Sequence, residues 1–103
     1  MVELEAVVAA HGRGAVDAEW RQVLLRVRSL SDRELQVFRL LAVGRSNREI
    51  SASLRVTERT SKAHVAQILS KLDVDSRLQA GLVAFAWLVL EQNDHRLALP
   101  AVP

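Results

Sequence analysis

Apolar residues recur at spacings of three and four along most of this chain, which is the pattern that predicts amphipathic α-helices. The clearest example is the set Leu35, Phe38 and Leu41, which predicts a helix over about residues 32–43. Further sets with this spacing, each preceded by a capping residue, predict three more helices, over about 47–54, 58–72 and 77–91.

Another amphipathic helix is predicted from Ala15 to Leu30, because apolar residues there alternate between spacings of four and three. A break is predicted at 11–14, and residues 3–10 fit either a short helix or a frayed end. The chain therefore divides into an N-terminal arm of one or two helices (1–28), a helical domain (29–91) and a flexible tail (92–103).

Capping residues support these boundaries. A capping box pairs a serine at the helix start with a glutamate or glutamine three residues later, and each satisfies a backbone amide of the other. Gly44 is predicted to end the 32–43 helix in a left-handed conformation, and Asp73 stands where a glycine would be expected. Three capping boxes and one threonine cap are predicted, at Ser31–Glu34, Ser46–Glu49, Ser76–Gln79 and Thr57.

Composition excludes several classes of protein. Half of the 103 residues are apolar, too many for a disordered chain, and the absence of cysteine excludes disulfides and thiolate zinc sites. Three widely separated histidines give no metal-ligand spacing, and four aromatic residues are too few for a single-strand stacking platform. No nucleophile, base and oriented partner can be assembled, so we expect no enzyme, no metal and no cofactor.

Neither a membrane span nor a signal peptide is predicted. The longest uncharged run, Leu78–Leu90, has 13 residues, whereas a spanning helix needs about 20. The N-terminus, Met1–Glu5, is acidic and does not resemble the basic start of a signal peptide. The expected location is the cytoplasm.

The predicted helices at 47–54 and 58–72 are joined by three residues, which is the spacing of a helix-turn-helix. Residues 30–90 resemble the LuxR-type (LuxR/FixJ) DNA-binding domain, a family of transcriptional regulators, in order and without gaps. The resemblance lies chiefly in Leu30-Ser31-x-Arg33-Glu34, Gly44-x-Ser46-Asn47-x-Glu49-Ile50, Thr60-x-Lys62-x-His64-Val65 and Ser76-Arg77-x-Gln79-Ala80.

The resemblance implies an all-α fold: a four-helix LuxR-type helix-turn-helix domain, here preceded by an extra amphipathic N-terminal helix. It also implies that the domain binds double-stranded DNA as a homodimer, with 58–72 as recognition helix and 77–91 as dimer contact. Only about 30 residues precede the domain. We therefore expect either a stand-alone bacterial regulator or the end of a longer protein.

Charge agrees with this interpretation. Between Arg45 and Lys71 there are six basic and two acidic residues, a net charge of +4 against +2 for the whole chain. Positive charge concentrated on a helix pair is typical of phosphate binding, although a solvated charged face is the alternative.

Helical periodicity sorts the residues of the recognition helix by face. Lysine can donate to guanine, glutamine can form two bonds with adenine, and alanine can contact a thymine methyl. Any single candidate can also be a plain surface residue. The base-reading candidates are Lys62, Ala63, Ala66 and Gln67, and the phosphate candidates are Asn47, Arg48, Arg59, Thr60, Lys71 and Arg77.

The sequence departs from the family pattern at Phe38, Ser61, Ala66 and Asp73. Ala66 removes a polar contact from the centre of the reading face, so we expect weaker or less specific DNA binding. The family pattern implies that His64 packs and forms hydrogen bonds. Glu34 is expected to cap its helix, with an added ion pair to an arginine of the 47–54 or 58–72 helix.

The 77–91 helix is apolar almost all round, although a terminal helix can bury only one face against its own domain. The other face predicts a dimer interface, and the alternative is cover by the N-terminal helix through Trp20, Val23 and Val27; both can hold. The interface candidates are Leu78, Leu82, Phe85, Ala86 and Val89.

The predicted function is sequence-specific DNA binding that regulates transcription. One alternative is a helix-turn-helix-derived interaction module, which would act mainly by pairing its last helix with a partner regulator. Another is a promoter-reading region of a sigma factor, although such regions usually end soon after the recognition helix.

Overall fold

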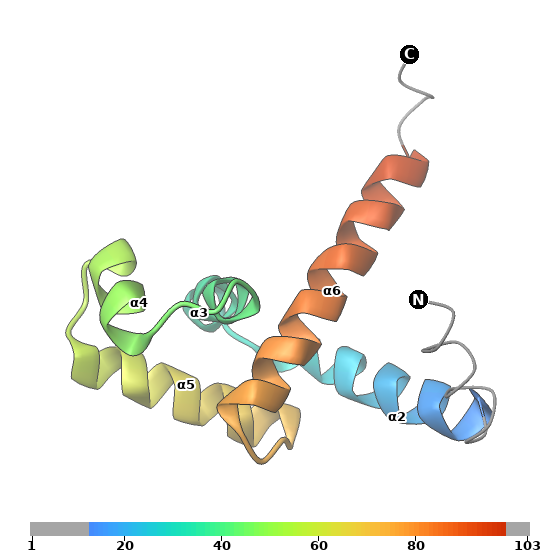
Figure 1. The fold of residues 1–103 in the computed structure, drawn as a ribbon, viewed down its shortest axis with the longest axis horizontal. Coiled ribbons are helices and arrows are strands. Elements are labelled where there is room, and N and C mark those ends of the chain that lie inside the picture. The colour runs from blue at the N-terminus through green and yellow to red at the C-terminus, as the bar shows by residue number, and fades with distance from the viewer. Residues whose placement is uncertain (1–12, 99–103) are drawn as a thin grey trace.

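The computed structural model describes the backbone of residues 13–98 and the side chains of residues 18–92, and it is helical almost throughout (Figure 1). α3, α4 and α5 gather at one end, α6 runs from the end of α5 past α3, and α2 lies beyond the other end of α5 (Figure 1). The elements are α2 (Arg13–Arg26), the 3-10 turn η1 (Val27–Ser29), α3 (Asp32–Ala42), α4 (Asn47–Leu54), α5 (Glu58–Leu72) and α6 (Arg77–Ala98).

Both predicted capping boxes of the first two domain helices are confirmed. The Ser31 hydroxyl accepts from the Glu34 amide at 3.1 Å, and the Glu34 carboxylate accepts from the Ser31 amide at 2.9 Å. Ser46 and Glu49 form the same pair of bonds with the same two distances. Local sequence therefore sets where α3 and α4 begin.

The third capping box is only half formed. Ser76 accepts from the Gln79 amide at 3.1 Å, as predicted. The Gln79 side chain, however, accepts from the amide of Asp75 at 2.6 Å instead of from Ser76. The turn that follows α5 brings the Asp75 amide within reach of Gln79 and so changes the partner.

Three residues have left-handed backbone conformations at helix ends. Gly44 has φ 75°, which confirms the predicted stop after α3. Asp73 has φ 56° and ends α5 without a glycine, a conformation that aspartate tolerates better than most residues. Arg55 has φ 57° in the turn between α4 and α5.

Two predicted helix boundaries are wrong. α6 runs to Ala98 rather than ending near residue 91, because residues 92–98 contain neither proline nor glycine and Pro100 is the first strong breaker. In the N-terminal arm, α2 starts at Arg13 and changes at Val27 to the 3-10 turn. The predictions for residues 1–12 and 99–103 lie outside the described residues.

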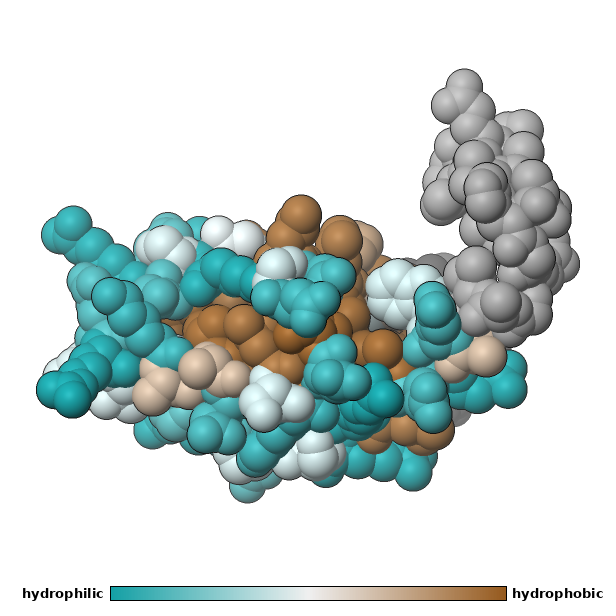
Figure 2. Space-filling view, turned by 90° about the horizontal axis from the view of Figure 1, so that it is seen from below, coloured by the Kyte–Doolittle hydropathy of each residue, from teal (hydrophilic) through white to brown (hydrophobic). Residues whose placement is uncertain are grey.

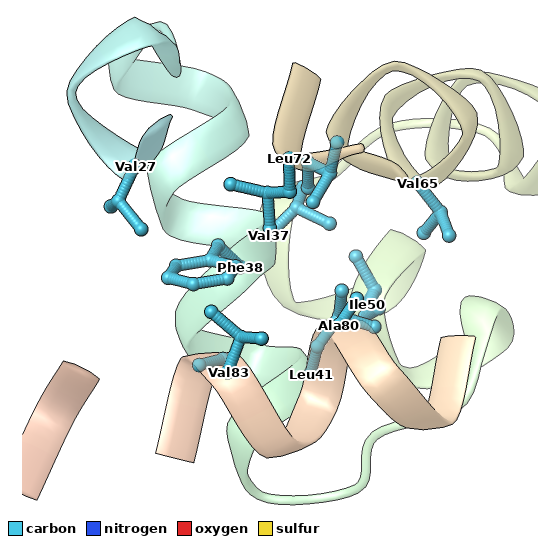
Figure 3. Packing of buried hydrophobic residues seen from close by; sticks show 11 residues of the cluster. Val27, Val37, Phe38, Leu41, Ile50, Val65, Leu72, Ala80 and Val83 are labelled. Atoms are coloured by element: carbon cyan, nitrogen blue, oxygen red, sulfur yellow. The ribbon is translucent and has the colours of Figure 1, made fainter. Parts of the chain in front are cut away.

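The core lies where α3, α5 and α6 meet (Figure 3). Phe38 is fully buried, and its ring lies 5.8 Å from the Trp87 ring of α6 in a tilted arrangement. α5 contributes Ile68 and Leu72, both fully buried, and α4 contributes Ile50. These contacts fix which face of α5 points inward.

α6 approaches α3 closely because its inner face is small. Ala80 and Ala84 are fully buried there. A Cβ atom on Gly81 would lie 3.2 Å from the Leu41 carbonyl oxygen, so a residue with a side chain there would require α3 and α6 to shift by a few tenths of an ångström. The arm joins the same core through Val27, which is buried, and Arg26, whose Nη1 donates to the Leu72 carbonyl at 3.3 Å.

Ser61 is a buried polar residue with an unpaired side chain. Its residue is fully buried on α5, and its hydroxyl is the one buried side-chain polar atom without a hydrogen-bond partner in the described part of the chain. Such a group has lost its hydration without a replacement, so it reduces stability.

Ser61→Ala should therefore stabilise the fold by about 1–2 kcal/mol, because it removes the unpaired hydroxyl and fills no new space. Ser70→Ala, at an exposed position of the same helix, is the matched control and should add only about 0.5 kcal/mol from helix propensity. Urea unfolding followed by circular dichroism measures both. Equal effects would contradict the assignment of a cost to the buried hydroxyl.

Candidate nucleic-acid interface

α4 and α5 form a helix-turn-helix. Arg55 turns the chain, and the Val56 amide returns to the Ser51 carbonyl at 3.1 Å, which closes the end of α4. The Thr57 hydroxyl then accepts from the Thr60 amide at 3.0 Å and starts α5, which confirms the predicted cap. The turn holds the start of α5 against α4 with no intervening loop.

α5 has one buried face and one solvent face. Ser61, Val65, Ile68 and Leu72 are buried. The four base-reading candidates, Lys62, Ala63, Ala66 and Gln67, are all exposed on the opposite side. The structure thus brings these candidates together on one surface, while their role in reading bases stays a prediction.

Exposed arginines surround that surface. Arg48 on α4 and Arg59 on α5 are both exposed, and neither forms an ion pair with another described residue. Arg55, in the turn, is exposed as well and is not among the predicted phosphate candidates. Its position in the turn of the helix-turn-helix makes Arg55 a further phosphate candidate, and the sequence already shows this basic residue between the two predicted helices.

Lys71 does not have a free charge. Its Nζ lies 2.7 Å from Glu34 Oε1, and Glu34 is only 6% exposed. The prediction that Glu34 pairs with an arginine is therefore wrong in the identity of the partner. Lys71 lies in the last turn of α5, where its long side chain reaches the first turn of α3. To contact a DNA phosphate, Lys71 would first have to break its ion pair with Glu34.

The same pair determines the acidity of Glu34. Burial by itself raises the pKa of this carboxyl group. The hydrogen bond from Lys71, together with the bond from the Ser31 amide and the positive charge of Lys71, outweighs burial and lowers the pKa below its ordinary value of 4.5. Glu34 is thus a charged, paired group in the folded protein at neutral pH.

Arg77 and Asn47 bind each other. Arg77 Nη1 donates to Asn47 Oδ1 at 2.6 Å, and Arg77 Nη2 donates to the Arg45 carbonyl. Both residues are half-buried. The two phosphate candidates that lie farthest apart in sequence are therefore neighbours, and two N–H donors of the guanidinium already have partners within the protein.

The remaining polar candidates on α5 are less accessible. The Thr60 hydroxyl, half-buried, accepts from the Thr57 hydroxyl at 3.0 Å. His64 is half-buried, in keeping with its expected packing role. Within residues 18–92, no group of His, Asp or Glu side chains is placed to hold a metal ion.

The outer face of α6 is exposed and apolar. Leu78, Leu82, Phe85 and Val89 are 72%, 54%, 58% and 41% exposed, and Ala86 is half-buried. Figure 2 shows hydrophobic residues in the middle of one face, while hydrophilic residues cover the end formed by α4 and the start of α5. The predicted dimer residues thus form a surface on the described part of the molecule.

The N-terminal helix covers this surface only in part. Val27 is buried and Val23 half-buried, but Trp20 is still 40% exposed. An almost wholly apolar groove remains between α2 and α6, lined by Trp20, Leu24, Phe85, Ala86, Val89 and Leu90. Cover by α2 and a further interface are therefore compatible.

Residues 28–84 match the family described as "Bacterial regulatory proteins, luxR family". The match spans more than half of the chain and includes α3, α4 and α5 and the start of α6. This chain belongs to the luxR family of bacterial regulatory proteins. It carries the family's DNA-binding helix-turn-helix domain. This match replaces the alternative that the chain is a promoter-reading region of a sigma factor.

Curated relatives resemble the chain over the same region. It is 48% identical over 56 residues to the transcriptional regulatory protein LiaR of Bacillus subtilis, covering 54% of this chain and 26% of LiaR. It is 39% identical over 83 residues to the response regulator protein VraR of Staphylococcus saprophyticus, covering 81% of this chain and 37% of VraR. The chain thus spans about a quarter of LiaR and just over a third of VraR. Among the described residues, no helix is long and apolar enough to cross a bilayer.

The Glu34–Lys71 pair predicts acid sensitivity. Because folding lowers the Glu34 pKa below 4.5, its contribution to stability is present above that value and is lost as pH falls through the folded pKa. Thermal unfolding between pH 3 and 7 should show this loss, and Glu34→Gln should make the acid branch shallower. An identical pH profile for the variant would show that another group governs acid unfolding.

Proposed function

We propose that this chain binds double-stranded DNA as a homodimer, with some preference for sequence, and thereby regulates transcription, with α5 in the major groove. The observation that supports this most directly is the solvent face of α5. Lys62 and Gln67 lie there beside two small alanines, and the core holds the opposite face inward. A helix of this kind fits the width of the major groove.

The chemistry of this face defines what it can read. Lys62 can donate to the O6 and N7 atoms of guanine, and Gln67 can bond adenine at two points. Ala63 and Ala66 allow close approach and contact with thymine methyl groups. Because only two of these four side chains are polar, we expect modest discrimination between sequences.

Phosphate contacts supply most of the affinity in this proposal. Arg48, Arg55 and Arg59 are exposed and carry charges that no described residue neutralises. Lys71 is paired with Glu34, so we assign it to the fold rather than to DNA. Arg45 is also partly compensated, at 3.6 Å from Glu49.

Dimerisation through α6 would present two copies of α5 to one face of DNA. Leu82 and Phe85 are large, apolar and more than half exposed, which is unfavourable for a monomer in water. A twofold axis beside α6 would place two recognition helices about 34 Å apart, one turn of the double helix.

The relatives are described as response regulators or transcriptional regulators of greater length. We infer that this chain does the work of their DNA-binding part, either alone or as part of a longer protein. Since its proposed ligand is bacterial DNA, we place it in the cytoplasm.

Arg59→Ala and Lys62→Ala should each weaken binding to a labelled duplex by about tenfold, because each removes one positive contact. Fluorescence anisotropy at about 50 and 200 mM salt measures affinity and its salt dependence. Arg33→Ala, an exposed arginine on α3, is the control and should leave affinity unchanged.

Two outcomes would contradict the proposal. Equal affinities for the Arg33, Arg59 and Lys62 variants would remove α5 as the reading element. An absence of wild-type binding at the lower salt would favour the interaction module, in which the outer face of α6 pairs with another regulator.

Phe85→Glu should convert the proposed dimer to a monomer, because it places a charge in the centre of the apolar face of α6. Sedimentation equilibrium of the DNA-free protein provides the measurement. Val43→Glu is the matched control, since Val43 is an exposed apolar residue (61%) at the end of α3, outside both α2 and α6, and it should leave the mass unchanged. A monomeric wild type at about 100 µM would disprove a stable DNA-free dimer.

A further inference from the structure

Arg77 is bound to two groups of its own protein. It is the first residue of α6, and its two terminal nitrogens donate to Asn47 Oδ1 and to the Arg45 carbonyl. These two bonds hold the guanidinium against the start of α4, so only its remaining N–H donors could reach a phosphate without breaking a bond within the protein. The contact thus joins α6 to the start of α4.

The bond decides how the Asn47 amide is oriented. Arginine has only donors, so the oxygen of the Asn47 amide must face it. The NH₂ group is then directed away from Arg77, and no described residue accepts a hydrogen bond from it. This leaves a side-chain donor at the first residue of α4, next to the capping residue Ser46.

We propose that Arg77 is a positioning residue for DNA binding: it fixes Asn47 so that the asparagine NH₂ donates to a DNA phosphate. In this role Arg77 does not touch DNA. Its hydrogen bond to Asn47, 30 residues away in sequence, also links α6, the proposed dimer helix, to the helix-turn-helix. The inference rests on the DNA binding proposed above.

Arg77→Lys separates the two possible roles. Lysine keeps the positive charge but cannot form the two-pronged contact with Asn47 and the Arg45 carbonyl. If Arg77 positions Asn47, affinity for the labelled duplex falls by about tenfold, as for loss of one charge-assisted hydrogen bond. If Arg77 contacts a phosphate directly, the lysine variant binds nearly as well as the wild type.

Two further measurements distinguish positioning from a general loss of structure. Asn47→Ala should weaken binding to a similar degree, and the double variant Asn47→Ala, Arg77→Lys should be no weaker than either single one. The slope of affinity against salt should stay that of the wild type in all three, since no charged contact is lost. Unchanged helical content by circular dichroism checks the fold.

Arg39→Lys is the matched control. Arg39 also joins its helix to α6, through an ion pair with Glu91 at 3.3 Å and a position 5.3 Å over the Trp87 ring. This variant should bind DNA as the wild type does, if the effect is specific to the Asn47 contact. If Arg77→Lys binds DNA with wild-type affinity, or if the losses add up in the double variant, the positioning role is wrong but the proposed DNA binding still stands. A wild type that does not bind DNA overturns the proposed function and the positioning role together.

Discussion

Burial of one face of α5 is the constraint on which the remainder of the domain depends. Val65, Ile68 and Leu72 pack into the core with Phe38 of α3, and complete burial of such a side chain contributes about 1.5–3 kcal/mol. A helix is a rigid cylinder, so fixing its inner face also fixes the opposite one. The exposed positions of Lys62 and Gln67 therefore follow from apolar packing on the other side of the helix.

Polar contacts over long sequence separations then hold α5 and its neighbours in place. Lys71 pairs with Glu34 of α3, and Arg26 of the arm donates to the last carbonyl of α5. Lys71 belongs to the basic segment that charge alone would assign to DNA. Within the helix-turn-helix, the positive charge that remains for a polyanion lies on Arg48, Arg55, Arg59 and Lys62.

α6 packs closely against α3 with one face and presents an apolar surface to solvent with the other, because its two faces carry side chains of different size. Its inner face uses alanine and Gly81 to lie close to α3, whereas its outer face carries leucines and Phe85 in solvent. The arm helix α2 narrows this outer surface but leaves the groove at Trp20 open. The arm and α6 together thus form one continuous apolar surface, so a partner docked on α6 would contact both.

The amino-acid sequence by itself determined the helices of the domain, the starts of α3, α4, α5 and α6, and the inner face of α5. Caps such as Ser31–Glu34 join residues three apart, and apolar stripes repeat every three or four residues, so both are visible in local sequence. The end of α6 was predicted too early, because the residues before the first proline contain no helix breaker and the helix continues through them. Only the tertiary structure decided that Lys71 pairs with Glu34 and that Arg77 pairs with Asn47, 37 and 30 residues away. Such partners meet because separate helices pack together, and a charged side chain in the sequence looks the same whether it meets another residue or solvent.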